Sequence, residues 1–408
     1  MPALEQVIDE LEQRLERYPA DRFPIQHATA QFHLGVTLAN AGRFPQAEPA
    51  LLEAVRLFKA GLPVEYAKSL NALGAVLRST GRPAGAAEVF GRAAEEFEQA
   101  EQVLEHGAAR FNLGLVLGEL GRPLAALDSF DRARELLDAQ RVPVQAAAAA
   151  RERGAILLAL GRFQEACEAL EEAVGLARRA GDLASVGAAA NALGLAQLAG
   201  GRPQEAAESL RLATSAHPKS LRAEAHAMAK ANLALAYERL GEAPRARLAA
   251  LQAVATPEAA PPTRAQAEAV LERLGRRVGE LAEVLDLEPP DRWAGTIREE
   301  MGRWLEMGGD ERRDEAAAWI TGQLSRPERG VELAEAWLGA MLELPPEAME
   351  QVIASSLEAL GPRDPEERKR FRGQVSQAMA RFHVPQWMRL KDTFNATAIR
   401  FGQEEGWG

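Results

Sequence analysis

The residue types best suited to chemistry are few and scattered in this sequence of 408 residues. Its six histidines include no two that lie four residues apart, so no pair places two metal ligands on one face of a helix. Cys167 is the single cysteine, which excludes an intrachain disulfide and a cysteine-based metal site. Phosphate-binding loops, dinucleotide fingerprints and nucleophile elbows are absent. We therefore predict no cofactor and no metal.

An enzymatic function is the least favoured of three hypotheses for this chain. Its site would lie in the C-terminal part of the chain, where His383, Arg381 and Asp392 are the only catalytic candidates. No spacing in the sequence indicates that these three side chains come together. We expect the protein not to be an enzyme.

The composition of the chain disfavours some classes of binding partner. The net charge of -11 and the isoelectric point near 5.3 disfavour binding to nucleic acid. The N-terminus has no basic segment followed by an apolar one, and no apolar run is long enough to span a membrane. We expect a cytoplasmic protein without nucleic-acid or membrane partners.

An internal repeat predicts the helices that would position any functional site. A glycine recurs at intervals of 39, 40, 40, 40 and 40 residues. The six glycines are Gly42, Gly81, Gly121, Gly161, Gly201 and Gly241. Glycine tolerates the left-handed conformation that ends a helix, and a proline soon afterwards suits the first turn of the next helix. Each glycine therefore predicts a turn between two helices, and the fixed period predicts a stack of helical hairpins.

Small and large residues recur at fixed distances from each turn glycine. Seven residues before it, the first helix carries a small residue: Gly35, Gly74, Gly114, Gly154, Gly194 and Ala234. Nine residues after it, the second helix carries Leu51, Phe90, Phe130, Leu170, Leu210 and, in the sixth unit, Ala250. Glycine inside a helix costs roughly 1 kcal/mol relative to alanine. We therefore expect another helix to approach the backbone closely there, with the large residue filling the gap between units.

This spacing of small and large residues resembles that of the tetratricopeptide repeat (TPR), in a long variant of about 40 residues. The resemblance implies an all-α fold: a right-handed superhelical solenoid of helix-turn-helix repeats, followed here by a separate helical C-terminal domain. We predict a capping helix in residues 1–24, six repeats in 25–255, a proline-rich linker with a capping or degenerate repeat helix in 256–288, and a helical domain in 289–408.

The C-terminal region differs from the repeats in composition. All six tryptophans lie beyond residue 290, and the period of turn glycines stops. Helical patterns continue at roughly 263–286, 291–307, 311–324, 327–343, 345–360, 364–383 and 385–401. At helical spacing we expect most tryptophans to lie in a core. Trp407 is the exception, since it follows Gly406 near the end, where it would either dock onto the protein or insert into a partner.

The resemblance also implies where a partner would bind, because the first helices of such repeats line a concave groove. The predicted partner-binding residues are Lys68, Asn71, Arg78, Asn112, Arg151, Asn191, Asn232 and Arg239. Phe32, Phe111 and Leu115 are among the apolar residues that would share this surface. Asparagine can bond both the donor and the acceptor of a peptide backbone, so a row of them suits an extended peptide. The alternative, that the asparagines only hold neighbouring repeats together, is equally compatible with the sequence.

Two non-enzymatic functions are therefore favoured over an enzymatic one. The leading one is a non-enzymatic scaffold or adaptor that holds a protein or peptide segment in the groove while the C-terminal domain contacts a second partner. The other is a peptide- or ligand-responsive regulator, in which the repeats switch the C-terminal helices. Exposed repeat ends also make self-association a prediction.

Overall fold

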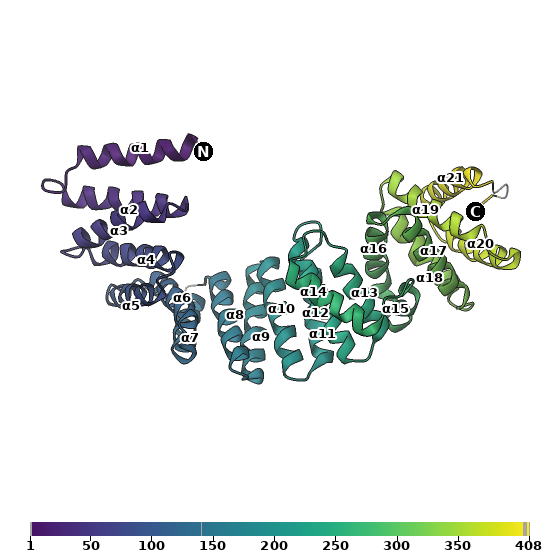
Figure 1. The fold of residues 1–408 in the computed structure, drawn as a ribbon, viewed down its shortest axis with the longest axis horizontal. Coiled ribbons are helices and arrows are strands. Elements are labelled where there is room, and N and C mark those ends of the chain that lie inside the picture. The colour runs from purple at the N-terminus through teal and green to yellow at the C-terminus, as the bar shows by residue number, and fades with distance from the viewer. Residues whose placement is uncertain (1, 140, 403–405, 408) are drawn as a thin grey trace. The chain divides into compact units, whose positions relative to one another are not determined.

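The computed structural model describes residues 2–139, 141–402 and 406–407, and within these ranges it contains 21 helices and no strand. The prediction of an all-α fold is confirmed. Contacts divide the chain into two compact units, Met1–Ala216 and His217–Gly408. Each unit is described by itself below, and the helices are labelled in Figure 1.

The first unit contains eleven helices that follow one another as antiparallel hairpins (Figure 1). They are α1 (Pro2–Arg17), α2 (Pro24–Asn40), α3 (Phe44–Phe58), α4 (Pro63–Ser79), α5 (Pro83–Gln99), α6 (Val103–Glu119), α7 (Pro123–Ala139), α8 (Pro143–Ala159), α9 (Phe163–Ala180), α10 (Leu183–Ala199) and α11 (Pro203–Ala216). Helix α1 packs against α2, and its role as a capping helix stays a prediction.

The second unit contains ten helices. They are α12 (Ala223–Arg239), α13 (Ala243–Val254), α14 (Pro261–Leu274), α15 (Leu281–Leu287), α16 (Pro290–Glu306), α17 (Gly309–Leu324), α18 (Gly330–Leu342), α19 (Pro346–Leu360), α20 (Pro365–Met379) and α21 (Val384–Arg400). In the described part of the chain, no helix is long and apolar enough to cross a membrane.

Every turn glycine adopts the conformation that the sequence predicts. The six have φ between +68° and +75°, which is the left-handed region. At Gly121, the N–H of the next residue, Arg122, donates to the carbonyl of Leu117 at 2.9 Å, and the other five turns repeat this bond. This is the hydrogen bond of a Schellman motif, which satisfies a carbonyl that the helix end leaves open. The turn glycines therefore end the first helices.

The small residue of the first helix lies against the large residue of the second helix in the same hairpin. A Cβ added to Gly74 would lie 2.7 Å from Phe90 Cε1, and one added to Gly154 would lie 2.5 Å from Leu170 Cγ. Real Cβ atoms essentially never come so close. The predicted close approach is confirmed in the first five units. Its partner is the large side chain of the same unit, not a group that fills the gap between units, and it occupies the space that a Cβ would need.

The predicted helix at 263–286 is wrong in its length. Helix α14 ends at Leu274, and Gly275 follows with φ +74°, a conformation that an L-amino acid rarely adopts. Helix α15 then begins at Leu281. The glycine therefore divides one predicted helix into two, because apolar spacing continued across a residue that the helix could not include.

The six remaining C-terminal helices lie within a few residues of their predicted positions, apart from the end of α20, and their tryptophans form the core as expected. The rings of Trp319 and Trp337 stack with centroids 4.8 Å apart, and Trp304 packs on Trp337 at 4.9 Å. Trp407 is fully buried against Phe394, so it docks onto its own unit. An aromatic side chain of this size contributes a large apolar area to the core.

The contact-based division falls before α12, whereas the sequence places the hairpin α12–α13 in the sixth repeat. This hairpin has the repeat turn at Gly241, with φ +75°. Helix α14 packs on both α12 and α13. The sixth repeat hairpin therefore belongs to the same compact unit as the C-terminal helices, and the boundaries predicted at residues 255 and 289 stay a prediction.

Candidate functional site

A pocket of about 220 Å³ lies where three successive first helices come together in the first unit. Its lining residues are Phe32 from α2, Lys68, Asn71 and Ala72 from α4, Phe97 from α5, and Glu105 and Ala108 from α6. We call this the groove pocket. Two of the eight predicted partner-binding residues line it, together with one predicted apolar residue. The walls are mainly apolar, and the polar groups lie at a few points around them.

The polar groups of the groove pocket are held by their neighbours. Lys68 Nζ pairs with Glu65 at 2.9 Å, one turn earlier on the same helix. Asn112 Nδ2 donates to Asn71 Oδ1 at 3.1 Å, which joins α6 to α4 across one repeat. Both asparagines are half-buried. The amide pair therefore holds neighbouring repeats together, as the second interpretation of the asparagines predicted.

This amide pair still has hydrogen-bonding capacity. Among the described residues, Asn71 Nδ2 and Asn112 Oδ1 have no protein hydrogen-bond partner. One is a donor and the other an acceptor, the two functions that a peptide backbone needs. Holding the stack and bonding a ligand are therefore compatible roles for these two residues.

The other predicted site residues do not join the groove pocket. Arg78 pairs with Glu119 at 2.7 Å across one repeat, and Arg151 pairs with its neighbour Glu152 at 2.8 Å. Both arginine side chains are about two-fifths exposed. Since exposed pairs are worth about 0–1 kcal/mol, these arginines are little constrained. Arg239 is exposed at the end of α12.

The two remaining asparagines are buried. Asn191 is 8% exposed and Asn232 is 4% exposed. Asn232 Oδ1 accepts a hydrogen bond from Gln266 Nε2 at 2.8 Å, which joins α12 to α14. A buried amide needs such partners to offset its desolvation. These asparagines therefore serve the packing of their units.

Sequence analysis missed four residues of the groove pocket. Ala72 and Ala108 lie at the repeat positions of the predicted residues Asn112 and Lys68, but as alanines they offered no chemical signal. Glu105 lies one turn before Ala108, so extending the helical stripe by one turn would have found it. Phe97 belongs to a second helix and is 2% exposed, so only its packing shows that it lines the groove pocket.

A second polar cluster lies in the second unit and connects the hairpin α12–α13 to α16. Lys230 Nζ lies 2.5 Å from Glu299 Oε2 and donates to Gln252 Oε1 at 2.8 Å. Gln252 Nε2 in turn donates to Glu300 Oε2 at 3.2 Å. Glu300 pairs with Arg303, whose guanidinium also reaches Glu315 of α17 at 2.7 Å. We call this chain of groups the buried charge network.

His226 completes the buried charge network at its other end. Its Nδ1 lies 2.8 Å from the carbonyl oxygen of His217, and its Nε2 lies 2.8 Å from Glu299 Oε1. Both neighbours are hydrogen-bond acceptors. Burial raises the pKa of Glu299, but the charge of Lys230 and the hydrogen bond from His226 outweigh it and lower the pKa to about 2. Glu299 is therefore held ionised between Lys230 and His226.

The residues named for an enzyme are not assembled into a site. Arg381 pairs with Glu335 at 2.6 Å, and no contact joins it to His383 or Asp392 in the part of the chain that the structure describes. All three side chains are exposed. Within the same residues, no group of three His, Cys, Asp or Glu side chains is placed to hold a metal ion.

Comparisons with known proteins identify the repeats. Two family models, both described as tetratricopeptide repeat, match this chain, one at residues 145–219 and the other at 32–101, 71–140 and 191–262. Together they cover 32–140 and 145–262, more than half of the sequence. No curated protein matches the chain.

Several solved structures are similar in fold. BtubC (BKLC) from P. vanneervenii is 20% identical, and the match covers 52% of this chain and 91% of that chain with a TM-score of 0.46. PilF of Pseudomonas aeruginosa is 15% identical, with 60% and 97% covered and a TM-score of 0.45. YrrB, a TPR protein described as having an unusual peptide-binding site, is 19% identical, with 51% and 92% covered and a TM-score of 0.38. At these identities the likeness concerns the fold alone.

Proteins built from these repeats bind protein or peptide partners, and the family is typically non-catalytic. Such a chain is in general terms a scaffold for protein–protein interaction, because its stacked hairpins present an extended surface. On the evidence of the matched models, the turns and the packed hairpins, this chain belongs to the tetratricopeptide repeat family.

Proposed function

We propose that the chain is a non-enzymatic scaffold whose first helices hold a protein or peptide segment, with the groove pocket as the anchor point. Of the remaining predicted partner-binding residues, Arg78, Asn112 and Arg151 lie in the same unit and are not buried, and they would contact the same segment further along the groove. The C-terminal helices would contact a second partner. The single observation that carries the proposal is the convergence of α2, α4 and α6 on one pocket of about 220 Å³.

The shape and chemistry of the groove pocket indicate what it would accept. Phe32, Phe97, Ala72 and Ala108 supply apolar walls, which suit an apolar side chain of the segment. Such a side chain gains free energy in proportion to the apolar area that it removes from water. Peptide anchors of this kind account for most of the binding energy at many interfaces.

The polar groups would fix the backbone of the segment. The free Nδ2 of Asn71 would donate to a peptide carbonyl, and the free Oδ1 of Asn112 would accept from a peptide N–H. Lys68 and Glu105 have opposite charges and both line the groove pocket. They would favour a segment with complementary charges on either side of its apolar residue.

The experiment is affinity capture from the source organism with two matched variants as additional baits. Ala108 is exposed in α6, so Ala108→Met would partly fill the groove pocket without disturbing the core. Ala148 lies at the same repeat position one unit later and does not line the groove pocket, so Ala148→Met is the control. Both variants must keep the parent helix signal and unfolding midpoint.

Each outcome decides one part of the proposal. A protein that the parent and Ala148→Met capture, but that Ala108→Met loses, would support the groove pocket as the anchor. Loss with both variants would support groove binding without this anchor. Capture of the same proteins by all three baits would show that the first helices are not the binding surface.

A second candidate function, the peptide-responsive regulator, is favoured by the buried charge network. Its ion pairs join the sixth repeat hairpin to α16 and α17, so a change in that hairpin would be transmitted to the C-terminal helices. Limited proteolysis and hydrogen exchange of residues 290–400 test it, with and without a peptide captured by the groove. Unchanged protection throughout α16–α21 on peptide binding would exclude switching.

A further inference from the structure

A larger pocket lies between the second helix of the second repeat and the turn of the third repeat. It has a volume of about 430 Å³, within the range of about 300–1,000 Å³ that is usual for ligand sites. The lining residues are Ala84, Ala87, Glu88 and Gly91 of α5, Leu113, Leu117 and Leu120 at the end of α6, and Arg122 and Ala125 around the start of α7. We call it the second-helix pocket. It shares no lining residue with the groove pocket.

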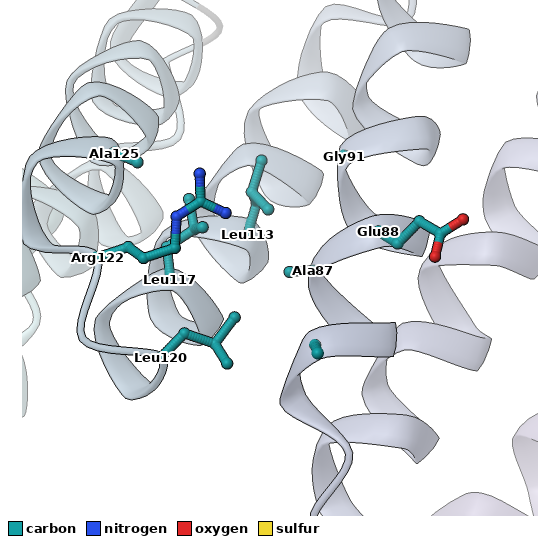
Figure 2. Close-up of a pocket in the computed structure, with 9 residues that line it drawn as sticks. Ala87, Glu88, Gly91, Leu113, Leu117, Leu120, Arg122 and Ala125 are labelled. Carbon is teal, nitrogen blue, oxygen red and sulfur yellow. The ribbon is translucent and has the colours of Figure 1, made fainter.

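The second-helix pocket is lined by two small residues of α5, Ala87 and Gly91. Every other repeat carries a larger residue at the position of Gly91, and the first, third and sixth repeats carry glutamate, leucine and arginine at the position of Ala87. Figure 2 shows Ala87 and Gly91 of α5 facing Leu113 and Leu117 across the pocket. The first repeat carries Glu48 and Leu52 at the positions of Ala87 and Gly91, six and ten residues after the turn glycine. A Cβ added to Gly91 would meet no atom within 4 Å. The second repeat therefore leaves open a space that larger side chains could fill.

Arg122, which lines the second-helix pocket, has different neighbours from the equivalent arginines of the other repeats. An arginine follows the turn glycine in five of the six repeats. Four of them pair with a carboxylate: Arg43 with Glu5, Arg82 with Glu48, Arg162 with Glu165 and Arg202 with Glu205.

Arg122 has neither of the partners that its equivalents use. Ala87 takes the place of Glu48, and Ala125 takes the place of Glu165. Among the described residues, Arg122 has no ion pair or hydrogen bond from its side chain. Figure 2 shows the guanidinium beside the leucines, and the carboxylate of Glu88 pointing away from it. An unpaired cation therefore lies at the edge of an apolar pocket.

We propose that the second-helix pocket is a separate docking site for a partner protein segment in which a leucine- or phenylalanine-sized side chain lies next to an acidic residue. The apolar side chain would lie between α5 and α6 against Leu113 and Leu117. The carboxylate would bind the guanidinium of Arg122, where arginine offers two parallel donors. Ala87 both helps to open the pocket and removes the carboxylate that its equivalent, Glu48, offers to Arg82, which is why apolar and charged recognition occur together here.

The test uses a phage-displayed library of random 12-residue peptides, panned on the intact chain. The matched control is Ala87→Glu combined with Gly91→Leu, which gives the second repeat the residues of the first and supplies Arg122 with an internal carboxylate. Since the first repeat folds with these residues and Gly91 has open space around it, the control variant should keep the parent unfolding midpoint. Arg122→Gln, at an exposed position, is the second variant.

We expect pocket-dependent peptides that share a leucine or phenylalanine within a few residues of aspartate or glutamate. Their affinity, measured by fluorescence anisotropy of synthetic copies, should fall at least about tenfold with Arg122→Gln, as the loss of a charge-assisted hydrogen bond requires. Binding should be lost with the double variant. Replacing the peptide carboxylate by an amide should weaken binding to the parent but not to Arg122→Gln.

Three results would overturn the proposal. One is a panned set in which every peptide binds the double variant as tightly as the parent, so that none depends on the second-helix pocket. Another is a pocket-dependent peptide set without acidic residues, or one that Arg122→Gln leaves unaffected. The third is a concentration-dependent dimer of the parent in light scattering that the double variant abolishes, since a second copy of the chain would then be the occupant.

Discussion

The packing of glycine against a large side chain predicts that one glycine-to-alanine change destabilises the repeats while another, in the same hairpin, stabilises them. Gly154 in α8 faces Leu170, and an added Cβ would lie 2.5 Å from its Cγ and 2.8 Å from its Cδ2. Both residues are buried, and Leu170 has 0% exposure, so neither can move into solvent. Overpacking of this kind costs about 1–3 kcal/mol, and alanine recovers about 1 kcal/mol of helix propensity. For a contact this short we expect Gly154→Ala to lower the free energy of unfolding by about 2 kcal/mol.

Gly175 in α9 is the matched control, because it is exposed and a Cβ there would meet no atom within 4 Å. Gly175→Ala should therefore raise the free energy of unfolding by up to about 1 kcal/mol. The assay is urea unfolding followed by the far-ultraviolet helix signal. Hydrogen exchange of α8 and α9 complements it, since repeat arrays can lose stability locally.

A double-mutant cycle identifies the contact responsible. Leu170→Ala alone should cost about 2–5 kcal/mol, and adding Gly154→Ala to it should cost little more, because the side chain that clashes is gone. The sixth repeat already carries this combination, with Ala234 and Ala250 at the two positions. The reasoning is refuted if Gly154→Ala is as stable as the parent, or if the two changes together cost the sum of their separate effects.

Three further predictions concern the second unit. Glu299 has a pKa lowered from 4.5 to about 2 on folding, so its pairing with Lys230 contributes stability above pH 4.5 that is lost as the pH falls from there towards 2. The contribution is on the order of 3 kcal/mol, and Glu299→Gln should remove this pH dependence from the unfolding midpoint. Arg247→Met should lower the free energy of unfolding by about 3–5 kcal/mol, because it leaves Glu280, with 2% side-chain exposure, as an unpaired buried charge. Adding Glu280→Leu should restore most of that stability, as measured by urea unfolding. Trp407→Ala should cost about 3–5 kcal/mol in the same assay, since the ring is fully buried, and an unchanged midpoint would show that the ring does not contribute to the core.

Repetition made the helical hairpins predictable. A single glycine followed by a proline is a weak signal of a turn, but the same pair of signals at a 40-residue interval is a strong one. All six turn glycines have the expected positive φ, because the conformation follows from the absence of a Cβ in that residue alone. The close approach of another group to the small residue of each first helix was also predictable, because glycine inside a helix is costly unless something needs the space of its missing side chain. The contact of this small residue with the large residue of its own hairpin required the packed structure.

The groove pocket was predictable only in part. Phe32, Lys68 and Asn71 have side chains that suggest a role, and their repeat positions place them on the first helices. Phe97 gave no such indication, because it belongs to a second helix and lines the groove pocket only through its packing in the folded hairpin. The pairing of Asn71 with Asn112 was also undecided, since a bond between residues 41 positions apart depends on the distance between repeats.

The sequence by itself determined the class of the fold, its helical hairpins and the absence of a recognisable catalytic motif, because these depend on local spacing and on residue type. Tertiary structure alone decided which residues meet across repeats. Glu299 between His226 and Lys230, and Arg122 without a carboxylate, both result from the packing of helices far apart in the sequence. Such contacts depend on the rotation and separation of whole helices, to which many residues contribute small amounts. A periodic sequence therefore reveals the stack, while the pockets and charge pairs within it are set by how closely neighbouring hairpins approach.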